Sequence, residues 1–137
     1  MNMVDRKYVQ MARAAAIQAY APYSGYRVGA ALVAEDGTVF TGCNVENAAY
    51  GSTMCAERVA LFKAVSEGRR KFVALALAAG TDVTGIPCGA CLQALSEFCD
   101  GAMPIACVTL TGAARLRSFT LRDLLPETFT IPGVHDT

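Results

Sequence analysis

Apolar residues recur every three or four positions in several parts of the chain, and this spacing predicts helices. The predicted helices cover residues 5–20, 53–67 and 87–98, with a short helical turn at 121–125. Ser52 or Thr53 is suited to cap the second helix, and Gly68 is suited to end it. Pro87 is suited to the first position of the third helix, where its missing N–H costs nothing.

The other apolar runs are shorter and are bounded by turn residues, which is typical of strands. They cover residues 27–34, 38–45, 72–79 and 104–110, with a short strand near 118–119. Asp36-Gly37, between the first two runs, predicts a hairpin and therefore an antiparallel pair. Strands that alternate with helices in the second half predict parallel crossovers. We expect an α/β fold: a three-layer α/β/α sandwich with one mixed, about five-stranded sheet.

Composition and charge narrow the classes of partner. No break in composition divides the 137 residues, so we expect a single domain that spans residues 1–137. Hydrophobic residues make up 53% of the chain and charged residues only 18%, an excess that favours self-association. Twelve basic residues balance twelve acidic ones, whereas nucleic-acid binding needs a surplus of Lys and Arg. A small, weakly charged partner is therefore expected, and no nucleic acid.

The sequence predicts neither a targeting segment nor a membrane span. Charged residues lie near the N-terminus, at positions 5–7, where a signal peptide needs an apolar run. Even the apolar run 72–80 is too short to cross a membrane. We expect a cytoplasmic protein with no membrane partner.

Six cysteines and one histidine limit the available chemistry. In a reducing compartment, cysteines are ligands, nucleophiles or core residues more often than disulfides. His135 lies beside the C-terminus, which disfavours Ser-His and Cys-His catalytic schemes. We expect Cys43, Cys99 and Cys107 to be core residues, because Cys99 is far along its helix and the others lie in apolar strands.

Pro87-Cys88-Gly89-Ala90-Cys91 places a C-x-x-C motif at a helix start. Two thiolates at this spacing can chelate an ion, although a thioredoxin-type redox pair uses the same position. Cys55 favours the metal, because it lies in the first turn of another predicted helix and adds a third thiol. Three sulfur ligands leave the fourth tetrahedral position free, as in catalytic zinc sites. We expect one Zn²⁺ per chain, held by Cys55, Cys88 and Cys91.

Two charged residues follow Cys55 closely enough to serve the same site. Glu57 is the candidate general acid and base, since a zinc-bound water needs a proton acceptor and no histidine is available. Arg58 lies on the same helical face as Cys55 and is the candidate donor to the sulfurs, whose three negative charges outweigh those of Zn²⁺. Taken singly, each could instead be an ordinary first-turn residue of a surface helix.

Together, Cys55-Ala56-Glu57 and the Pro87–Cys91 motif resemble the small homotetrameric cytidine deaminases of the three-cysteine type, over nearly the whole chain. The resemblance implies a cytidine deaminase-like fold and a homotetramer. It also implies zinc-dependent hydrolysis of cytidine and 2′-deoxycytidine to uridine and 2′-deoxyuridine, with release of ammonia, in pyrimidine salvage. Glu57 would pass protons to N3 of the ring and then to the leaving amino group. Ala56 carries over as a substrate-binding residue.

The same resemblance assigns a nucleoside-binding stretch. Asn44 and Glu46 are two positions apart at a strand end, so their side chains are expected on one face. An amide beside a carboxylate suits a ribose hydroxyl, which donates and accepts, and in the family these positions hold the 3′-hydroxyl. Tyr26 falls where the family usually has a phenylalanine stacked near the base, with core packing as the alternative.

Three further residues match contacts that the family makes across subunits: Ala48, Tyr50 and Phe129. If they carry over, each active site is completed only in the oligomer. The chain departs from the family pattern at Tyr26, which adds a hydroxyl to the pocket wall. It also departs at Leu92, where relatives commonly carry arginine.

Three alternatives stay open at this stage. One is a deaminase of a modified cytosine nucleoside, such as a blasticidin-type antibiotic. A nucleic-acid-editing deaminase is disfavoured by the zero net charge. A non-catalytic, zinc-stabilised binding module would need a fourth protein ligand and would leave Glu57 without a role.

Overall fold

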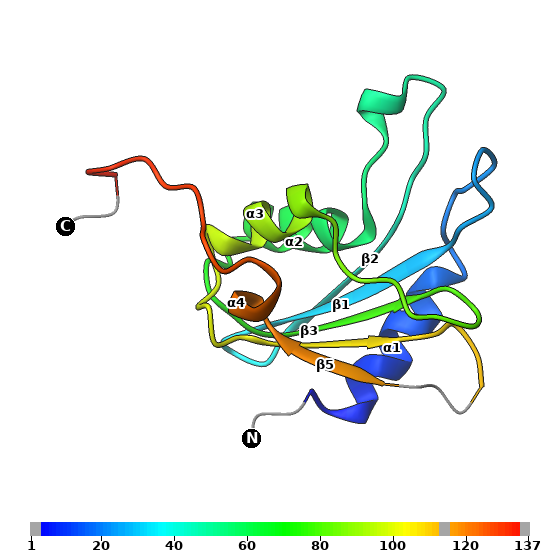
Figure 1. Ribbon diagram of the computed structural model, residues 1–137, viewed down its shortest axis with the longest axis horizontal. Coiled ribbons are helices and arrows are strands. Elements are labelled where there is room, and N and C mark those ends of the chain that lie inside the picture. Colours follow the sequence, from blue (N-terminus) through cyan, green and yellow to red (C-terminus); the bar gives the residue numbers. More distant parts are fainter. Residues whose placement is uncertain (1–3, 113–115, 135–137) are drawn as a thin grey trace.

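The structure is a computed structural model that describes residues 4–112 and 116–134, so His135 lies outside it (Figure 1). The helices are α1 (Arg6–Ala16), α2 (Ala56–Ser66), α3 (Gly89–Ser96) and α4 (Leu121–Leu124), with a 3-10 turn at Tyr50–Ser52. The strands are β1 (Val28–Ala34), β2 (Val39–Cys43), β3 (Phe72–Ala79), β4 (Pro104–Val108) and β5 (Arg117–Thr120). In these two ranges, no helix has the length and apolar character needed to cross a membrane.

The five strands form one mixed sheet in the order β2-β1-β3-β4-β5. β3 and β4 are parallel, joined through α3, and the other neighbours are antiparallel. The predicted hairpin turns at Gly37, whose positive φ of 89° suits glycine. Figure 1 shows α1 on one face of the sheet and α2 and α3 on the other. The expected three-layer α/β/α architecture is confirmed.

The alternation of side chains along the central strands sorts the core into two layers. On β3, Leu75 and Leu77 point toward α2 and α3, whereas Ala74, Ala76 and Ala78 point toward α1. Both sets are buried, which explains why the strand reads as one continuous apolar run. The small residues let α1 pack close to the sheet, and the larger ones fill the layer that carries the site.

Gly42 on β2 fixes the start of α2. A Cβ atom at Gly42 would lie 2.5 Å from the carbonyl oxygen of Ala56 and 2.6 Å from the backbone nitrogen of Ala60. Both atoms belong to the backbone of α2, so neither can turn away as a side chain can. The helix therefore rests directly on the strand, and this contact sets the height of its first turn.

We expect Gly42→Ala to lower the free energy of unfolding by at least about 2 kcal/mol, because the added methyl group must push α2 off the sheet. Gly51→Ala is the matched control, since a Cβ there meets no atom within 4 Å. Urea unfolding followed by circular dichroism measures both. Equal stability of the two variants would contradict the contact.

Three predicted helix ends were wrong, and tertiary pairing explains the first two. The first helix stops at Ala16 because Tyr20 pairs with the strand extension, its N–H donating to Asn44 O at 3.0 Å. The second helix begins at Ala56, not near Ser52 or Thr53, because Met54 exchanges backbone hydrogen bonds with Val45 at 2.9 Å. The third begins at Gly89: Cys88 is still extended, so Pro87 precedes the cap instead of opening the helix.

Candidate active site

The two helix starts bring three thiols together. Cys55 is the N-cap residue of α2 and Cys88 that of α3, and Cys91 lies in the first turn of α3. The Sγ atom of Cys88 is 3.9 Å from that of Cys55 and 3.4 Å from that of Cys91, and all three lie within 4.8 Å of one another. The side chain of neither capping cysteine accepts a cap hydrogen bond from its helix, so both sulfurs can face the same point.

This cluster fits zinc. Zn–S bonds of about 2.3 Å at tetrahedral angles separate sulfurs by about 3.8 Å, close to the spacings observed. Burial and the charge of Glu57 raise the pKa of Cys91 well above its usual range, so three thiolates here need a cation between them. Among the described residues, no other group of three His, Cys, Asp or Glu side chains has such spacing. Cys55, Cys88 and Cys91 are the residues that would hold the metal.

The other three cysteines lie outside the cluster. Cys107 is fully buried in the core on β4, and Cys99 packs against the same core. Burial raises the pKa of each of these two thiols to about 12, so they stay protonated. Cys43, the last residue of β2, is half-buried. Core packing is confirmed for Cys107 and, with part of its surface exposed, for Cys99; Cys43 is also partly exposed.

Glu57 is the buried acid of the site. It lies in the first turn of α2, only 4% exposed, and lines the same cavity as Cys55 and Cys88. Burial raises the pKa of its carboxyl group, while hydrogen bonds from its own backbone N–H and from Cys91 oppose this rise. A carboxyl group whose pKa is raised in this way accepts a proton more readily than an exposed carboxylate and can return it to a reacting group.

Arg58 reaches the cluster from the same turn. Its Nη2 atom donates a hydrogen bond to Sγ of Cys55 at 3.4 Å, as the sequence predicted from their shared helical face. That bond raises the pKa of the guanidinium group, which stays charged. A positive charge beside the sulfurs offsets part of their negative charge.

A cavity of about 290 Å³ opens beside the thiols. Cys55, Cys88, Ala56 and Glu57 line one end of it. The remaining walls come from five segments of the chain, and these residues are Ser24, Tyr26, Val28, Asn44, Glu46, Thr53, Met54, Leu77, Ala79, Gly85 and Ile86. Sequence reasoning missed Gly85 and Ile86, whose one signal was their position just before Pro87-Cys88.

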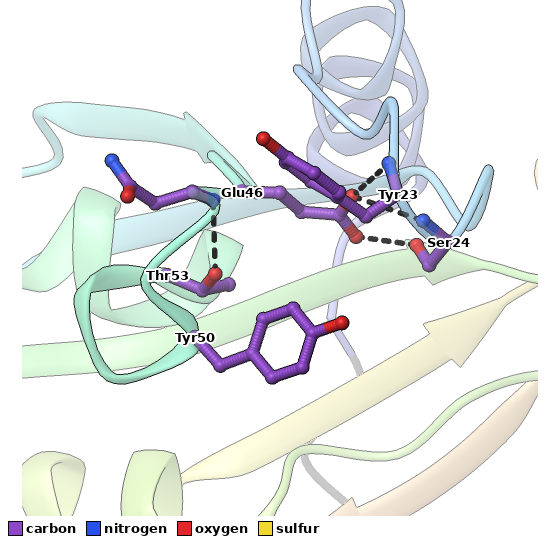
Figure 2. Close-up of a pocket in the computed structure, with 6 residues that line it drawn as sticks. Tyr23, Ser24, Glu46, Tyr50 and Thr53 are labelled. Atoms are coloured by element: carbon purple, nitrogen blue, oxygen red, sulfur yellow. Dashed lines mark hydrogen bonds between the residues drawn. The ribbon is translucent and has the colours of Figure 1, made fainter.

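Asn44 and Glu46 hold the backbone around the cavity. Asn44 is 8% exposed and pairs with the chain opposite, accepting from Val28 N at 2.9 Å and donating to Tyr26 O at 2.8 Å. Glu46 accepts from the backbone N–H groups of Tyr23 and Ser24 at 2.9 and 3.1 Å, and from the Ser24 hydroxyl (Figure 2). These bonds, first that from the hydroxyl, lower the pKa of Glu46, which stays ionised.

Comparison with known proteins identifies the family. The family model for the "Cytidine and deoxycytidylate deaminase zinc-binding region" matches residues 3–107. The chain belongs to this deaminase family. It is 51% identical to the cytidine deaminase of Sporosarcina psychrophila over 124 residues, 90% of each chain. It is 48% identical to that of Halalkalibacterium halodurans over 118 residues, covering 86% of this chain and 88% of the relative.

Solved structures agree with the family assignment. The crystal structure of the cytidine deaminase from Burkholderia pseudomallei superposes with a TM-score of 0.85 at 44% identity, covering 93% of this chain and all of the other. The predicted resemblance and the cytidine deaminase-like fold are therefore confirmed.

In this member of the deaminase family, three of the predicted residues lie away from the cavity. Ala48 is exposed, Tyr50 is 80% exposed, and Phe129 is 71% exposed. Tyr50 lines a second hollow of about 360 Å³ with Tyr23, Asn47 and other residues, and this hollow shares Ser24, Glu46 and Thr53 with the cavity (Figure 2). A single chain therefore leaves all three side chains facing outward.

The two departures from the family pattern have different surroundings. Tyr26 lines the cavity and is not a core residue, so the core alternative was wrong. Leu92 is 5% exposed and belongs to the core layer under α2 and α3. The side chain at position 92 therefore takes part in apolar packing.

Proposed function

We propose that the protein is a cytidine deaminase, which hydrolyses cytidine and 2′-deoxycytidine to uridine and 2′-deoxyuridine and releases ammonia. The observation that carries this proposal is the meeting of three thiols and a buried carboxyl group at one end of a cavity. The zinc-binding deaminase model and the named relatives support it.

The residues at the thiol end divide the chemistry. The metal that Cys55, Cys88 and Cys91 would hold would act as a Lewis acid and lower the pKa of water, which would make the water a better nucleophile toward C4 of the pyrimidine. Glu57 would take one proton from water and give it to N3, and would then take the second proton from the hydroxyl group at C4 and give it to the amino group, which leaves as ammonia. Arg58 donates to Cys55 and keeps the sulfur charge in balance. We assign Ala56, which lines the same end of the cavity, to contact with the base.

The other end of the cavity suits a sugar without a phosphate. Asn44 and Glu46 line it, and Glu46 keeps acceptor capacity beyond its bonds to residues 23 and 24. We assign them to the ribose hydroxyls and Tyr26 to the wall beside the base. Among the residues that the structure describes, no Lys or Arg lines this cavity or the second hollow beside Glu46. A phosphate would meet a carboxylate there instead of a cation, so a nucleoside is the better substrate than a nucleotide.

We further propose a homotetramer in which Ala48, Tyr50 and Phe129 complete the cavity of a neighbouring subunit. Their exposure in the single chain supports this assignment. A cytoplasmic role in pyrimidine salvage, with no nucleic-acid or membrane partner, agrees with the zero net charge. Sedimentation velocity tests the tetramer directly.

None of the three alternative functions is favoured. A closed binding module needs a fourth metal ligand, and no fourth His, Cys, Asp or Glu joins the three thiols in the described part of the chain. For a modified nucleoside such as a blasticidin-type antibiotic, kcat/KM relative to cytidine discriminates between the two substrates.

The direct test follows the ultraviolet change as cytidine becomes uridine, together with ammonia release and zinc content. We expect turnover of cytidine and deoxycytidine, none of CMP, and about one zinc per chain. A zinc-loaded protein that leaves both nucleosides unchanged would overturn the proposal.

A contact between Tyr26 and Gly85 gives a prediction about the cavity wall. A Cβ atom at Gly85 would lie 2.6 Å from the Tyr26 hydroxyl oxygen and 3.1 Å from Cβ of Ala79. Gly85→Ala must therefore displace the tyrosine ring, and we expect KM for cytidine to rise about tenfold, which corresponds to a cost of about 1.4 kcal/mol.

Tyr26→Phe removes the atom responsible for the shorter contact. We expect the Tyr26→Phe/Gly85→Ala double variant to recover most of the lost affinity, because only the milder contact with Ala79 remains. Steady-state kinetics of the four proteins in this cycle measure the coupling. Additive effects of the two substitutions would contradict the contact.

A further inference from the structure

The chain after α4 has no regular structure, and every residue from 126 to 134 is exposed. Figure 1 shows this segment projecting from the body of the protein near α3. It carries three exposed apolar side chains: Phe129, Ile131 and Val134. An exposed segment of this kind needs a specific attachment if its side chains are to reach a defined place.

Gln93 supplies such an attachment. Its Nε2 atom donates to the carbonyl oxygen of Phe129 at 2.8 Å, and its Oε1 atom accepts from the N–H of Phe129 at 3.2 Å. A single side-chain amide thus satisfies both backbone groups of one residue, as a neighbouring strand would. The backbone of Phe129 is fixed while its ring stays 71% exposed.

The position of Gln93 ties this segment to the active site. Gln93 lies on α3, two residues after Cys91, so one short helix carries two of the three thiols and the attachment of the segment. Ordering a free backbone costs conformational entropy at every residue. An attachment made in advance removes part of that cost when the ring meets a partner surface.

We propose that Gln93 is a positioning residue, which holds the backbone of Phe129 so that its ring enters the cavity of a neighbouring subunit. This inference rests on the proposed function, in which Phe129 serves the neighbour's site. Gln93 touches no substrate; it acts through Phe129 alone. The competing explanation is that Gln93 only stabilises its own chain.

Kinetics of Gln93→Met test the proposal. Methionine keeps the length and helix propensity of glutamine but bonds neither backbone group of Phe129. We expect KM for cytidine to rise about fivefold or more, the equivalent of one to two hydrogen bonds, with kcat within about twofold of wild type. Gln10→Met, at an exposed position of α1, is the control and should change neither constant.

Two further variants check that the effect passes through Phe129. Phe129→Ala should also raise KM, and adding Gln93→Met to it should cause no further change. Gln93→Glu keeps the acceptor but loses the donor, so its KM should fall between those of wild type and Gln93→Met. If Gln93→Met fails to fold, Gln93→Glu still tests the proposal. A KM for Gln93→Glu equal to that of wild type would overturn it.

Mixed oligomers separate the two explanations. Subunits with Gln93→Met and subunits with Glu57→Gln are co-expressed with different tags, and assemblies that contain both are purified. Only the Gln93→Met subunits can react, and some now meet an intact segment from a neighbour. We expect a kinetic phase with the wild-type KM; its absence would overturn the proposal. Lack of turnover in the wild type would instead refute the proposed function.

Discussion

Replacing Glu57 with glutamine is expected to lower kcat by about a hundred- to ten-thousandfold, the range typical for loss of a general acid and base. Glutamine has nearly the same shape, so it fills the buried position at the start of α2 without leaving a hole. It cannot take a proton from water and pass it on. The expected defect is therefore chemical and leaves the folded structure unchanged.

Zinc content makes this first prediction specific. Because Glu57 is not one of the three clustered ligands, the variant should keep about one zinc per chain, as should Glu57→Ala. Glu67→Gln, at the exposed far end of the same helix, is the control and should behave as wild type. Turnover comes from the ultraviolet assay and zinc from mass spectrometry. Full activity of Glu57→Gln would disprove the proton-transfer role, and loss of its zinc would make Glu57 a ligand.

The second large effect is expected from Cys91→Ser. Cys91 is fully buried and its thiol lies 3.4 Å from that of Cys88, so no other side chain can replace it as a ligand without moving α3. We expect roughly a tenth of the wild-type zinc content after dialysis. Turnover should fall more than about a hundredfold, because the loss of groups that merely support a zinc ligand already costs up to that much.

Cys43→Ser is the matched control for this second prediction. Cys43 is also a free cysteine, but it lies at the end of β2 and outside the cluster. It should keep both zinc and activity. Equal zinc loss in the two variants would show that the metal is held elsewhere.

The sequence was most informative about features that depend on residues only a few positions apart. Cys88 and Cys91 are three residues apart, so any helix start at this point brings them together, and Arg58 follows Cys55 by the same interval. The alternation of apolar runs was likewise enough to predict a mixed sheet with helices on both faces. Such features depend on neighbours along the chain, which the sequence displays directly.

Features that depend on distant residues could not be predicted. The true start of α2 is set by pairing of Met54 with Val45, and its height by Gly42, neither of which a helical pattern reveals. The bonds from Gln93 join residues 36 positions apart. Asn44 was expected to face a sugar, and two of its four hydrogen-bonding positions also hold the backbone of Tyr26 and Val28. Tertiary contact decides each of these.

The placement of Cys55 and Cys88 at two helix caps affects how firmly α2 and α3 are held together. The positive ends of α2 and α3 point at one spot, and like ends repel unless a negative charge lies between them. Three thiolates around one divalent cation carry that charge. The metal centre therefore cross-links the starts of α2 and α3, which are 33 positions apart in sequence. Removal of the metal by a chelator should therefore weaken the packing between α2 and α3 as well as stop the reaction.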